Sequence, residues 1–310
     1  MKITQKVKKI LTKYESDNPG TKANLARILS SGKLGGTGKL LILPVDQGFE
    51  HGPARSFAPN PQAYDPHYHW NLAIDAGLSA FAAPLGLLEL GADTFAGSIP
   101  TILKINSANS LNGETEAPSQ AITANVSDAI RLGCSAIGYT IYPGSINSYE
   151  MIEDLREISE EARALGLAMV VWSYPRGAYV SKSGETALDI VSYAAHMAAL
   201  AGAHIIKVKL PSDSIELSSA QKVYQENSIP SSSLSDRVKH VVQSCFNGKR
   251  IVVFSGGGKK DLNGLYDEAK AIHKGGGNGS IIGRNTFQRK REEAIMMLNN
   301  LIAIYKGVNL

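Results

Sequence analysis

Residues 250–258 read RIVVFSGGG, a β-branched and apolar run that stops at one serine and three glycines. Such a run predicts a short buried strand that ends in a tight turn. Seven further runs of this kind occur, each followed by a helix-like amphipathic segment, and they span residues 39–45, 79–83, 101–106, 136–141, 168–173, 204–210 and 279–282. Eight successive strand-and-helix units predict an α/β protein with a single closed (β/α)8 TIM barrel.

The chain divides at the first of these runs. Residues 1–38 precede it and predict an N-terminal helical extension, which either closes the bottom of the barrel or joins a neighbouring molecule. Residues 39–310 then form the barrel domain, which would carry any active site.

Several helices between the strands can be placed from their patterns. Residues 149–165, 235–246 and 289–305 each combine an apolar face with polar positions around it, as amphipathic helices do. The small apolar stretch at residues 197–203 predicts a helix packed on the barrel. Residues 212–235 form one long polar insertion, which suggests a lid or an interface loop.

Composition and charge exclude several classes of protein. The 310 residues carry 32 Lys and Arg against 28 Asp and Glu, a formal net charge of +4, without a block of like charges, so we expect no nucleic-acid partner. No uncharged apolar stretch is long enough for a membrane span, and residues 1–14 lack the apolar core that a signal peptide needs. The two cysteines, Cys134 and Cys245, lie far apart and have no zinc-like spacing, so we expect a cytoplasmic protein without a structural metal.

Two lysines occur in the sixth predicted strand. Because active sites of such barrels lie at the carboxyl ends of the strands, the residues there are candidates for chemistry. Lys207 and Lys209 stand two apart, so both point to the same face, either into the barrel or toward the helices. A lysine inside the barrel would have a depressed pKa and could attack a carbonyl to form a Schiff base. A lysine on the helix side would simply extend its ammonium to water, and the spacing does not select the nucleophile.

Glycine-bearing turns follow the last two strands, where barrels of this type usually bind phosphate. Glycines allow backbone N–H groups to approach phosphate oxygens, and an arginine adds a forked, charged contact. The glycines at 275–277 precede the last strand and are expected to end a helix instead. The predicted phosphate-binding residues are Ser255, Gly256, Gly257, Gly283 and Arg284.

Other strand ends carry groups that could move protons. Asp46 ends the first strand and Tyr174 follows the fifth, so a carboxylate and a phenol could act on a bound carbonyl compound. Each residue type also occurs commonly as a turn or rim residue. His67 and His69 offer an alternative, a zinc site, but they follow several prolines and fit loop packing better.

Five segments together resemble one enzyme family: PVDQGFEHGP (44–53), WSYPRG (172–177), IIKVKLP (205–211), VVFSGGG (252–258) and GSIIGRNTFQR (279–289). They resemble the class I fructose-bisphosphate aldolases of the archaeal type, in the branch that bacteria also have. The resemblance extends from about residue 38 to residue 307. It implies a (β/α)8 barrel that needs no metal or other cofactor and assembles as a homo-oligomer, often a decamer.

The resemblance also implies roles for individual residues. Lys207 would be the Schiff-base nucleophile, Tyr174 the general acid/base and Asp46 the carboxylate that handles the substrate hydroxyl. The glycine-bearing turns would bind the phosphate of dihydroxyacetone phosphate. Gln47 stands where relatives commonly have a histidine, so that position departs from the family. The residues implied to bind or surround the substrate are Trp172, Arg176, Gln47, Lys104 and Lys209.

The implied reaction is metal-independent, reversible cleavage of fructose 1,6-bisphosphate to dihydroxyacetone phosphate and glyceraldehyde 3-phosphate. A related enzyme could instead use its lysine for transaldol-type or acyl transfer on another phosphorylated ketose. A non-catalytic barrel that binds sugar phosphates is a further alternative, and a metal-dependent aldolase would need a histidine-rich zinc site. The preferred ketose, the direction of flux and metabolite regulation are not readable from the residues.

Overall fold

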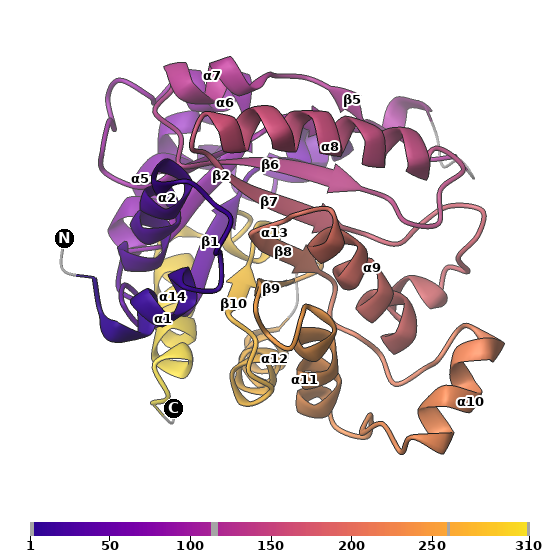
Figure 1. Cartoon of the computed structure of the whole chain (residues 1–310). Helices are drawn as coiled ribbons and strands as arrows, with labels where there is room; N and C mark the ends of the chain where they lie inside the picture. The colour runs from indigo at the N-terminus through magenta and orange to yellow at the C-terminus, as the bar shows by residue number, and fades with distance from the viewer. Residues whose placement is uncertain (1–2, 113–116, 259–260, 309–310) are drawn as a thin grey trace.

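Eight parallel strands close into a barrel in the computed structural model, which describes residues 3–112, 117–258 and 261–308 (Figure 1). Around the barrel the strands follow the order β1-β10-β9-β8-β7-β6-β3-β2. Their bounds are β1 Leu40–Pro44, β2 Ala80–Pro84, β3 Thr101–Lys104, β6 Ala136–Ile141, β7 Ala168–Ser173, β8 Ile205–Val208, β9 Ile251–Ser255 and β10 Gly279–Ile281. All eight predicted strands are present, so the predicted barrel is confirmed.

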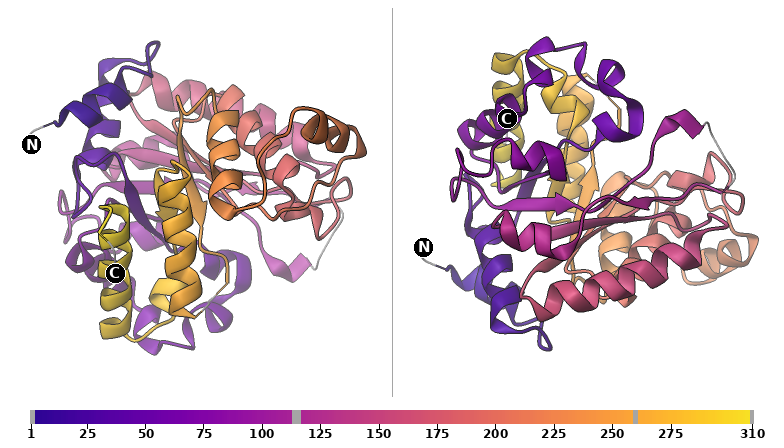
Figure 2. Two further views of the ribbon diagram at one scale, coloured as in Figure 1. Left: turned by 90° about the horizontal axis from the view of Figure 1, so that it is seen from below. Right: turned by 90° about the horizontal axis from the view of Figure 1, so that it is seen from above.

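Seven helices form most of the layer outside the strands (Figure 2). The longest, α8, buries Met151, Leu155, Ser159 and Ala162, which recur on one face of the helix and pack against the sheet. The seven are α5 Pro66–Ala76, α7 Val126–Arg131, α8 Ser148–Ala164, α9 Leu188–Leu200, α11 Leu234–Ser244, α12 Leu262–Lys274 and α14 Arg291–Tyr305. Among the described residues, none of the helices combines the length and apolar character that crossing a membrane requires.

The predicted helices at 149–165, 235–246 and 289–305 correspond to α8, α11 and α14, with ends shifted by up to two residues. The stretch at 197–203 is only partly helical, because α9 ends at Leu200 and a turn follows. As expected, the glycines at 275–277 follow the end of α12. The polar insertion at 212–235 contains α10 Ser218–Glu226, which projects from the barrel (Figure 1).

Short helices lie in the loops between the main elements, and several follow the carboxyl ends of the strands. They are α3 Gln47–His51, α4 Pro53–Phe57, α6 Leu85–Glu89, α13 Arg284–Phe287 and the 3₁₀ helices η1 Pro61–Tyr64, η2 Ser110–Asn112 and η3 Gly184–Thr186. The sequence did not predict the antiparallel pair β4 Asn106–Ser107 and β5 Ala121–Ile122. β3 ends at Lys104, and the predicted strand to residue 106 therefore breaks where this pair begins.

Alternate strand residues fill the interior of the barrel. Small residues such as Ala82 and Ala136 leave room for larger ones such as Ile205 and Trp172, so this narrow lumen is packed. The same inward positions continue to Lys104 and Lys207 at the carboxyl ends of their strands, because side chains two apart share a face. The lumen is thus apolar along most of its length and cationic at the carboxyl ends of the strands.

The N-terminal segment closes the opposite end of the barrel. It forms α1 Gln5–Leu11 and α2 Pro19–Ser30, and the Asn18 side chain caps α2 by accepting a hydrogen bond from Thr21 N–H. Val7 and Leu29 from these helices pack in one apolar cluster with the inward strand residues. This contact agrees with the first of the two predicted positions, at the barrel bottom.

Tyr14, between α1 and α2, ties this segment to two strands. Its hydroxyl donates to the His204 carbonyl oxygen at 2.7 Å and accepts from the Ile251 N–H at 3.2 Å, and the side chain is buried. Burial raises the pKa of Tyr14, so the phenol stays protonated as a donor.

We expect Tyr14→Phe to reduce the free energy of unfolding by about 0.5–1.5 kcal/mol, because it removes the hydroxyl that donates to the buried His204 carbonyl oxygen, while the Ile251 N–H still donates to that oxygen at 3.3 Å. Urea unfolding monitored by circular dichroism measures the change. Tyr149→Phe is the matched control, since Tyr149 is 79% exposed. Equal stability of the two variants would show that the Tyr14 hydroxyl contributes nothing.

Candidate active site

Lys207 lies inside the barrel near the end of β8 and is 4% exposed. Its Nζ lies 5.1 Å from the centroid of the Trp172 ring and 5.4 Å from that of Tyr174. Within the described part of the chain, no side chain forms an ion pair or a hydrogen bond with this Nζ. Burial lowers the pKa of Lys207 to about 8, although Asp46 and Glu50 oppose the shift. Near neutral pH a larger fraction of this lysine is therefore the free, nucleophilic amine than for a lysine with the ordinary pKa of 10.5.

Lys209 lies one residue beyond β8 and has a different environment. It forms an ion pair with Glu185 of η3, and burial together with Arg176 lowers its pKa while Glu185 opposes the shift. Glu185 favours the protonated form of Lys209, and only the free amine of a lysine is a nucleophile. The two lysines, which the sequence left equivalent, therefore differ in the structure.

Trp172 spans the lumen beside Lys207, to which it is paired in register across β7 and β8. Gly138 on β6 makes room for the indole, since a Cβ there would lie 2.4 Å from Trp172 Cζ3. The indole N–H is buried and has no protein partner, so it can donate to a ligand.

Tyr174 follows β7 and faces the space around Lys207 and Trp172 at the carboxyl ends of the strands, which we call the chamber. Burial raises its pKa well above the usual value, and Asp46 and Glu50 add to the shift, while a hydrogen bond with Ser255 opposes it. The phenol is therefore protonated near neutral pH and can donate a proton. Ser255, predicted to bind phosphate, thus also contacts Tyr174.

The chain after β1 places two carboxylates at the mouth of the barrel. Asp46 precedes α3 and has a buried Oδ1 without a protein partner. Glu50 lies one turn further along α3 and pairs with Arg176, with 3.4 Å between Oε1 and Nη1. Sequence reasoning did not assign Glu50, although it lies within the motif PVDQGFEHGP. The sequence alone did not indicate that Glu50 pairs with Arg176, because the two residues are 126 positions apart.

Arg176 also stacks on an aromatic side chain. Its Cζ lies 4.6 Å from the centroid of the Tyr142 ring, and its Nε is buried without a partner. Burial raises the pKa of Tyr142 to about 12. Gln120, which sequence reasoning also missed, donates to the Tyr142 hydroxyl and accepts from Lys104.

The two glycine-bearing turns lie side by side. Asn285 joins them, because its Nδ2 donates to the carbonyl oxygens of Gly256 at 3.2 Å and Gly258 at 2.8 Å. Gly257 has a φ of +66°, in the left-handed region that favours glycine. Among the described residues, no backbone carbonyl accepts from the N–H groups of Gly256, Gly257 or Gly283. Such a group of free amides is suited to an anion.

Gln47 and Arg284 border these turns. A Cβ on Gly283 would lie 3.0 Å from Gln47 Nε2 and 2.8 Å from the Pro44 carbonyl oxygen, so the position requires glycine. Gln47 Oε1 is buried without a partner. The charge of Arg284 contributes to lowering the pKa of Lys207.

The histidines considered as metal ligands contact carbonyl groups instead. His67 and His69 lie in the first turns of α5, so the expected loop is a helix. The Nε2 atoms of His67 and His69 are within 2.6 and 2.8 Å of the carbonyl oxygens of Leu90 and Ala63. The geometry thus gives these two rings a packing role.

Comparison with known proteins agrees with this geometry. The family model described as DeoC/LacD family aldolase matches residues 40–289. A probable fructose-bisphosphate aldolase class 1 from Chlamydia muridarum is 38% identical over 304 residues, covering 94% of this chain and 86% of the relative. The fructose-bisphosphate aldolase class 1 of Thermoproteus tenax is 39% identical over 255 residues, covering 82% and 85%.

A solved structure is similar over most of its length. It is an archaeal fructose-1,6-bisphosphate aldolase whose catalytic lysine is covalently bound to the carbinolamine intermediate of the substrate. The TM-score is 0.72 at 34% identity, with 86% of this chain and 94% of that chain covered. The resemblance inferred from five sequence segments is therefore confirmed, and the chain belongs to the class I fructose-bisphosphate aldolases of the DeoC/LacD aldolase family.

Proposed function

We propose that this protein reversibly cleaves fructose 1,6-bisphosphate to dihydroxyacetone phosphate and glyceraldehyde 3-phosphate through a Schiff base on Lys207, without a metal or other cofactor. The observation that carries the proposal is the Lys207 amine, buried at the end of β8 without an ion-pair partner in the described structure. The named activities of the relatives support it.

In the proposed reaction, Lys207 Nζ attacks the C2 carbonyl of the open-chain ketose and water leaves, which gives an iminium. When the C3–C4 bond breaks, its electron pair moves into the iminium to form an enamine. A base takes the proton of the C4 hydroxyl, so that glyceraldehyde 3-phosphate leaves as the aldehyde. Tyr174 then protonates the enamine at C3, and hydrolysis releases dihydroxyacetone phosphate and the free amine.

The unpaired polar atoms of the chamber match a phosphorylated polyol. Asp46 Oδ1 and Gln47 Oε1 are buried acceptors that sugar hydroxyl groups would satisfy. Trp172 Nε1 and Arg176 Nε are buried donors for substrate oxygens. The free amides of Gly256, Gly257 and Gly283, with Arg284, would hold one phosphate, while Lys104 and Lys209 complete the cationic lining.

Borohydride trapping tests the proposal. The protein is incubated with dihydroxyacetone phosphate and a chelator, reduced with sodium borohydride and analysed by peptide mass spectrometry. We expect an adduct on Lys207 and, in a separate assay, cleavage of fructose 1,6-bisphosphate. An adduct without cleavage would indicate another phosphorylated ketose, and binding without an adduct would indicate a non-catalytic barrel. Activity lost on chelation would point to a metal-dependent enzyme.

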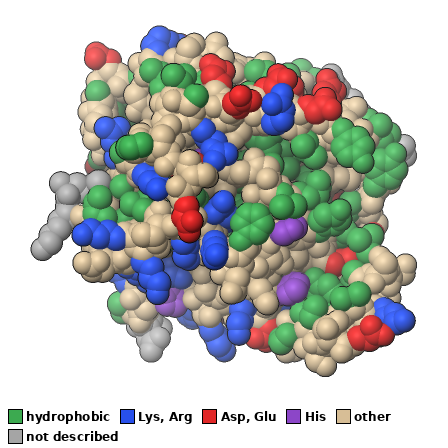
Figure 3. All heavy atoms as spheres, in the orientation of Figure 1, with side chains coloured by type: hydrophobic (Ala, Val, Ile, Leu, Met, Phe, Trp, Pro, Cys, Tyr) green, Lys and Arg blue, Asp and Glu red, His purple; other side chains and the backbone are tan. Residues whose placement is uncertain are grey.

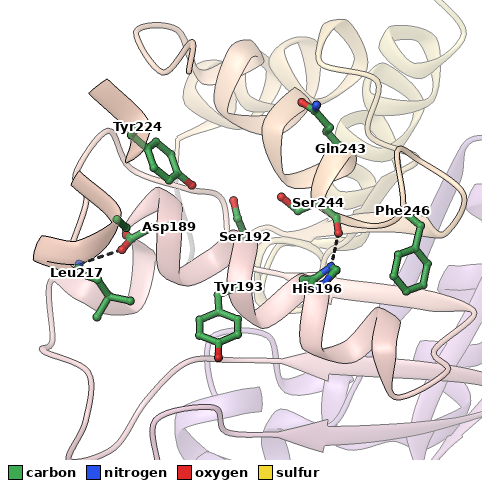
Figure 4. A pocket seen from close by; sticks show the side chains of 10 residues that line it. Asp189, Ser192, Tyr193, His196, Leu217, Tyr224, Gln243, Ser244 and Phe246 are labelled. Carbon is green, nitrogen blue, oxygen red and sulfur yellow. Dashed lines mark hydrogen bonds between the residues drawn. The ribbon is translucent and has the colours of Figure 1, made fainter. Parts of the chain in front are cut away.

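We also propose that the chain forms a homo-oligomer in the cytoplasm. A groove of about 510 Å³ between α9, α10 and α11 supports self-association (Figure 4). Tyr193, His196, Tyr224 and Phe246 line it, and aromatic residues are enriched in interfaces. Hydrophobic side chains gather on the same face of the molecule (Figure 3). The two buried free cysteines are compatible with a reducing compartment.

We expect Tyr193→Lys to weaken self-association, because it places a charge at a groove residue that is 59% exposed. Sedimentation velocity at several protein concentrations would show a smaller assembly than the wild type. Tyr179→Lys, at another exposed tyrosine, is the control. A wild-type monomer at every concentration would contradict the proposed oligomer, and an unchanged assembly of Tyr193→Lys would contradict the use of this face.

A further inference from the structure

One ion pair crosses the mouth of the barrel. Glu50 lies in α3, which follows β1, and Arg176 lies in the loop that follows β7. β7 is the fourth neighbour of β1 in both directions around the closed barrel, so the two strands stand opposite each other. Even so, Glu50 Oε1 and Arg176 Nη1 are 3.4 Å apart. The two side chains therefore reach toward each other across the opening of the chamber.

The space beside Glu50 is small. A cavity of about 20 Å³ lies there, and Asp46, Glu50, Lys104, Tyr142 and Tyr174 are among the residues that line it. Such a volume holds about one water molecule, whereas binding sites for small molecules commonly enclose about 300–1,000 Å³. A ketose bisphosphate is larger than this cavity, so side chains at the mouth must move when it binds.

Arg176 has other contacts that hold it. The guanidinium stacks on the Tyr142 ring, with 4.6 Å from Cζ to the ring centroid. Tyr142 is 2% exposed, and its hydroxyl accepts a hydrogen bond from Gln120 Nε2. The backbone N–H of Arg176 donates to the Pro143 carbonyl oxygen at 3.0 Å. These contacts orient the guanidinium, and the Glu50 carboxylate is an additional partner.

The Glu50 carboxylate can be replaced by a stronger anion. Its Oε2 also lies 3.8 Å from His51 Nε2. The Glu50 and Arg176 side chains are 35% and 31% exposed, and ion pairs with this much contact with water are weak. A phosphate group carries nearly two negative charges and three acceptor oxygens, whereas a carboxylate carries one charge and two oxygens. A phosphate at Arg176 would therefore displace Glu50.

The order of the strands indicates which phosphate of the substrate would reach Arg176. The glycine-bearing turns follow β9 and β10, Lys207 lies near the end of β8, and Arg176 follows β7, the next strand around the barrel. In the proposed reaction, a ketose with one phosphate in the turns and its C2 carbonyl at Lys207 directs its far end toward Arg176. That end carries the second phosphate, which leaves with glyceraldehyde 3-phosphate.

We propose that Glu50 is an internal competitor for Arg176: its carboxylate pairs with the guanidinium in the free protein, and the second phosphate of the substrate replaces it. The inference rests on the proposed function and deepens it. Because Glu50 must leave Arg176 before that phosphate binds, it weakens the binding of fructose 1,6-bisphosphate and of glyceraldehyde 3-phosphate. Its return to Arg176 favours release of this product. Glu50 acts through Arg176 in this role and does not touch the reacting atoms.

The test removes the charge of Glu50 and keeps its shape. Glu50→Gln has the same length and can still accept a hydrogen bond from Arg176. Its KM for fructose 1,6-bisphosphate is compared with the concentration of dihydroxyacetone phosphate that half-saturates borohydride trapping on Lys207. Dihydroxyacetone phosphate lacks the second phosphate and so does not compete with Glu50. Glu89→Gln is the control for loss of a carboxylate that pairs with an arginine elsewhere, since Glu89 and Arg131 lie 2.7 Å apart.

A second effect of Glu50 must be separated from this one. Its charge also raises the pKa of Lys207, so the variant has more of the free amine. That change acts on both ligands alike, because both form their Schiff base on Lys207. The quantity measured is therefore the relative KM, which is the KM for fructose 1,6-bisphosphate divided by the half-saturating concentration of dihydroxyacetone phosphate.

For Glu50→Gln we expect the relative KM to fall about two- to fivefold, as loss of a partly exposed ion pair predicts. Inhibition by glyceraldehyde 3-phosphate should strengthen by the same factor, and Glu89→Gln should match the wild type in both. An unchanged relative KM would overturn the inference, and a higher one would show instead that Glu50 orients Arg176 for the substrate. A wild type that does not cleave fructose 1,6-bisphosphate would overturn the proposed function and this inference with it.

Glu50→Ala is a second variant, in case glutamine at this position disturbs the fold. It also lacks the charge, so its relative KM should fall as well, and a value equal to that of the wild type would overturn the inference. Circular dichroism checks that each variant is folded before the assays.

Discussion

Lys207→Met should lower the rate of fructose 1,6-bisphosphate cleavage by at least about 10⁴-fold, as loss of a covalent nucleophile does. Methionine fills the space of the lysine stem between Trp172 and Tyr174 but has no amine to form the iminium. Without the iminium, the electron pair of the C3–C4 bond has nowhere to go. Steady-state assays measure the loss of cleavage, and borohydride trapping measures the loss of the iminium.

Lys209→Met is the matched control for this prediction. It removes a lysine two positions away that is paired with Glu185, so the Lys207 adduct should still form. Lys207→Met should also be at least as stable as the wild type, because it removes a buried ammonium without a carboxylate partner. Substantial turnover in Lys207→Met, or an adduct on Lys209, would contradict the assignment of the nucleophile.

The same lysine predicts the pH dependence of the first step. Its pKa of about 8 means that the amine is mostly protonated below that value and mostly free above it. Imine formation should therefore accelerate as pH rises through about 8. Between this value and the ordinary 10.5 the unfolded chain binds more protons at Lys207, so this residue makes stability rise with pH there.

Tyr174→Phe should lower turnover by about 10²–10⁴-fold while the Schiff base still forms, because only the proton donor to the enamine is removed. Exchange of the C3 proton of dihydroxyacetone phosphate with deuterated water, followed by NMR, isolates that step. We expect exchange to slow by the same factor as turnover. Borohydride should still trap an adduct on Lys207.

Tyr142→Phe tests whether the effect is specific to Tyr174. Tyr142 is a second buried phenol at the mouth, but it stacks on Arg176 and bonds with Gln120 rather than facing Lys207. Its removal should affect C3 exchange much less than removal of Tyr174. Wild-type exchange in Tyr174→Phe would show that another group protonates the enamine.

Much of the site could be predicted because, in a barrel of this type, the order of strands along the chain fixes where the residues that follow each strand lie. Once eight strands are recognised, their carboxyl ends must meet at one mouth, so Asp46, Tyr174 and Lys207 are brought together without any knowledge of long-range contacts. The phosphate-binding turns follow from the same rule, since they succeed the last two strands. The roles of individual residues came from the resemblance and remain predictions for the experiments above.

The rest depended on pairings that no local pattern contains. Glu50 pairs with Arg176, Lys209 pairs with Glu185, and Gln120 accepts a hydrogen bond from Lys104. The β4 and β5 pair was missed for a related reason: two residues a strand are too few to show an alternation of apolar and polar positions.

The sequence by itself determined the barrel, its order and the set of residues at its mouth, because burial alternates along each strand and the connections between parallel strands are local. Only the tertiary structure decided which lysine is unpaired and which is neutralised. The burial and ion pairing of a lysine depend on side chains from other strands and loops. The distances between the lysine and those side chains are set only when the barrel closes.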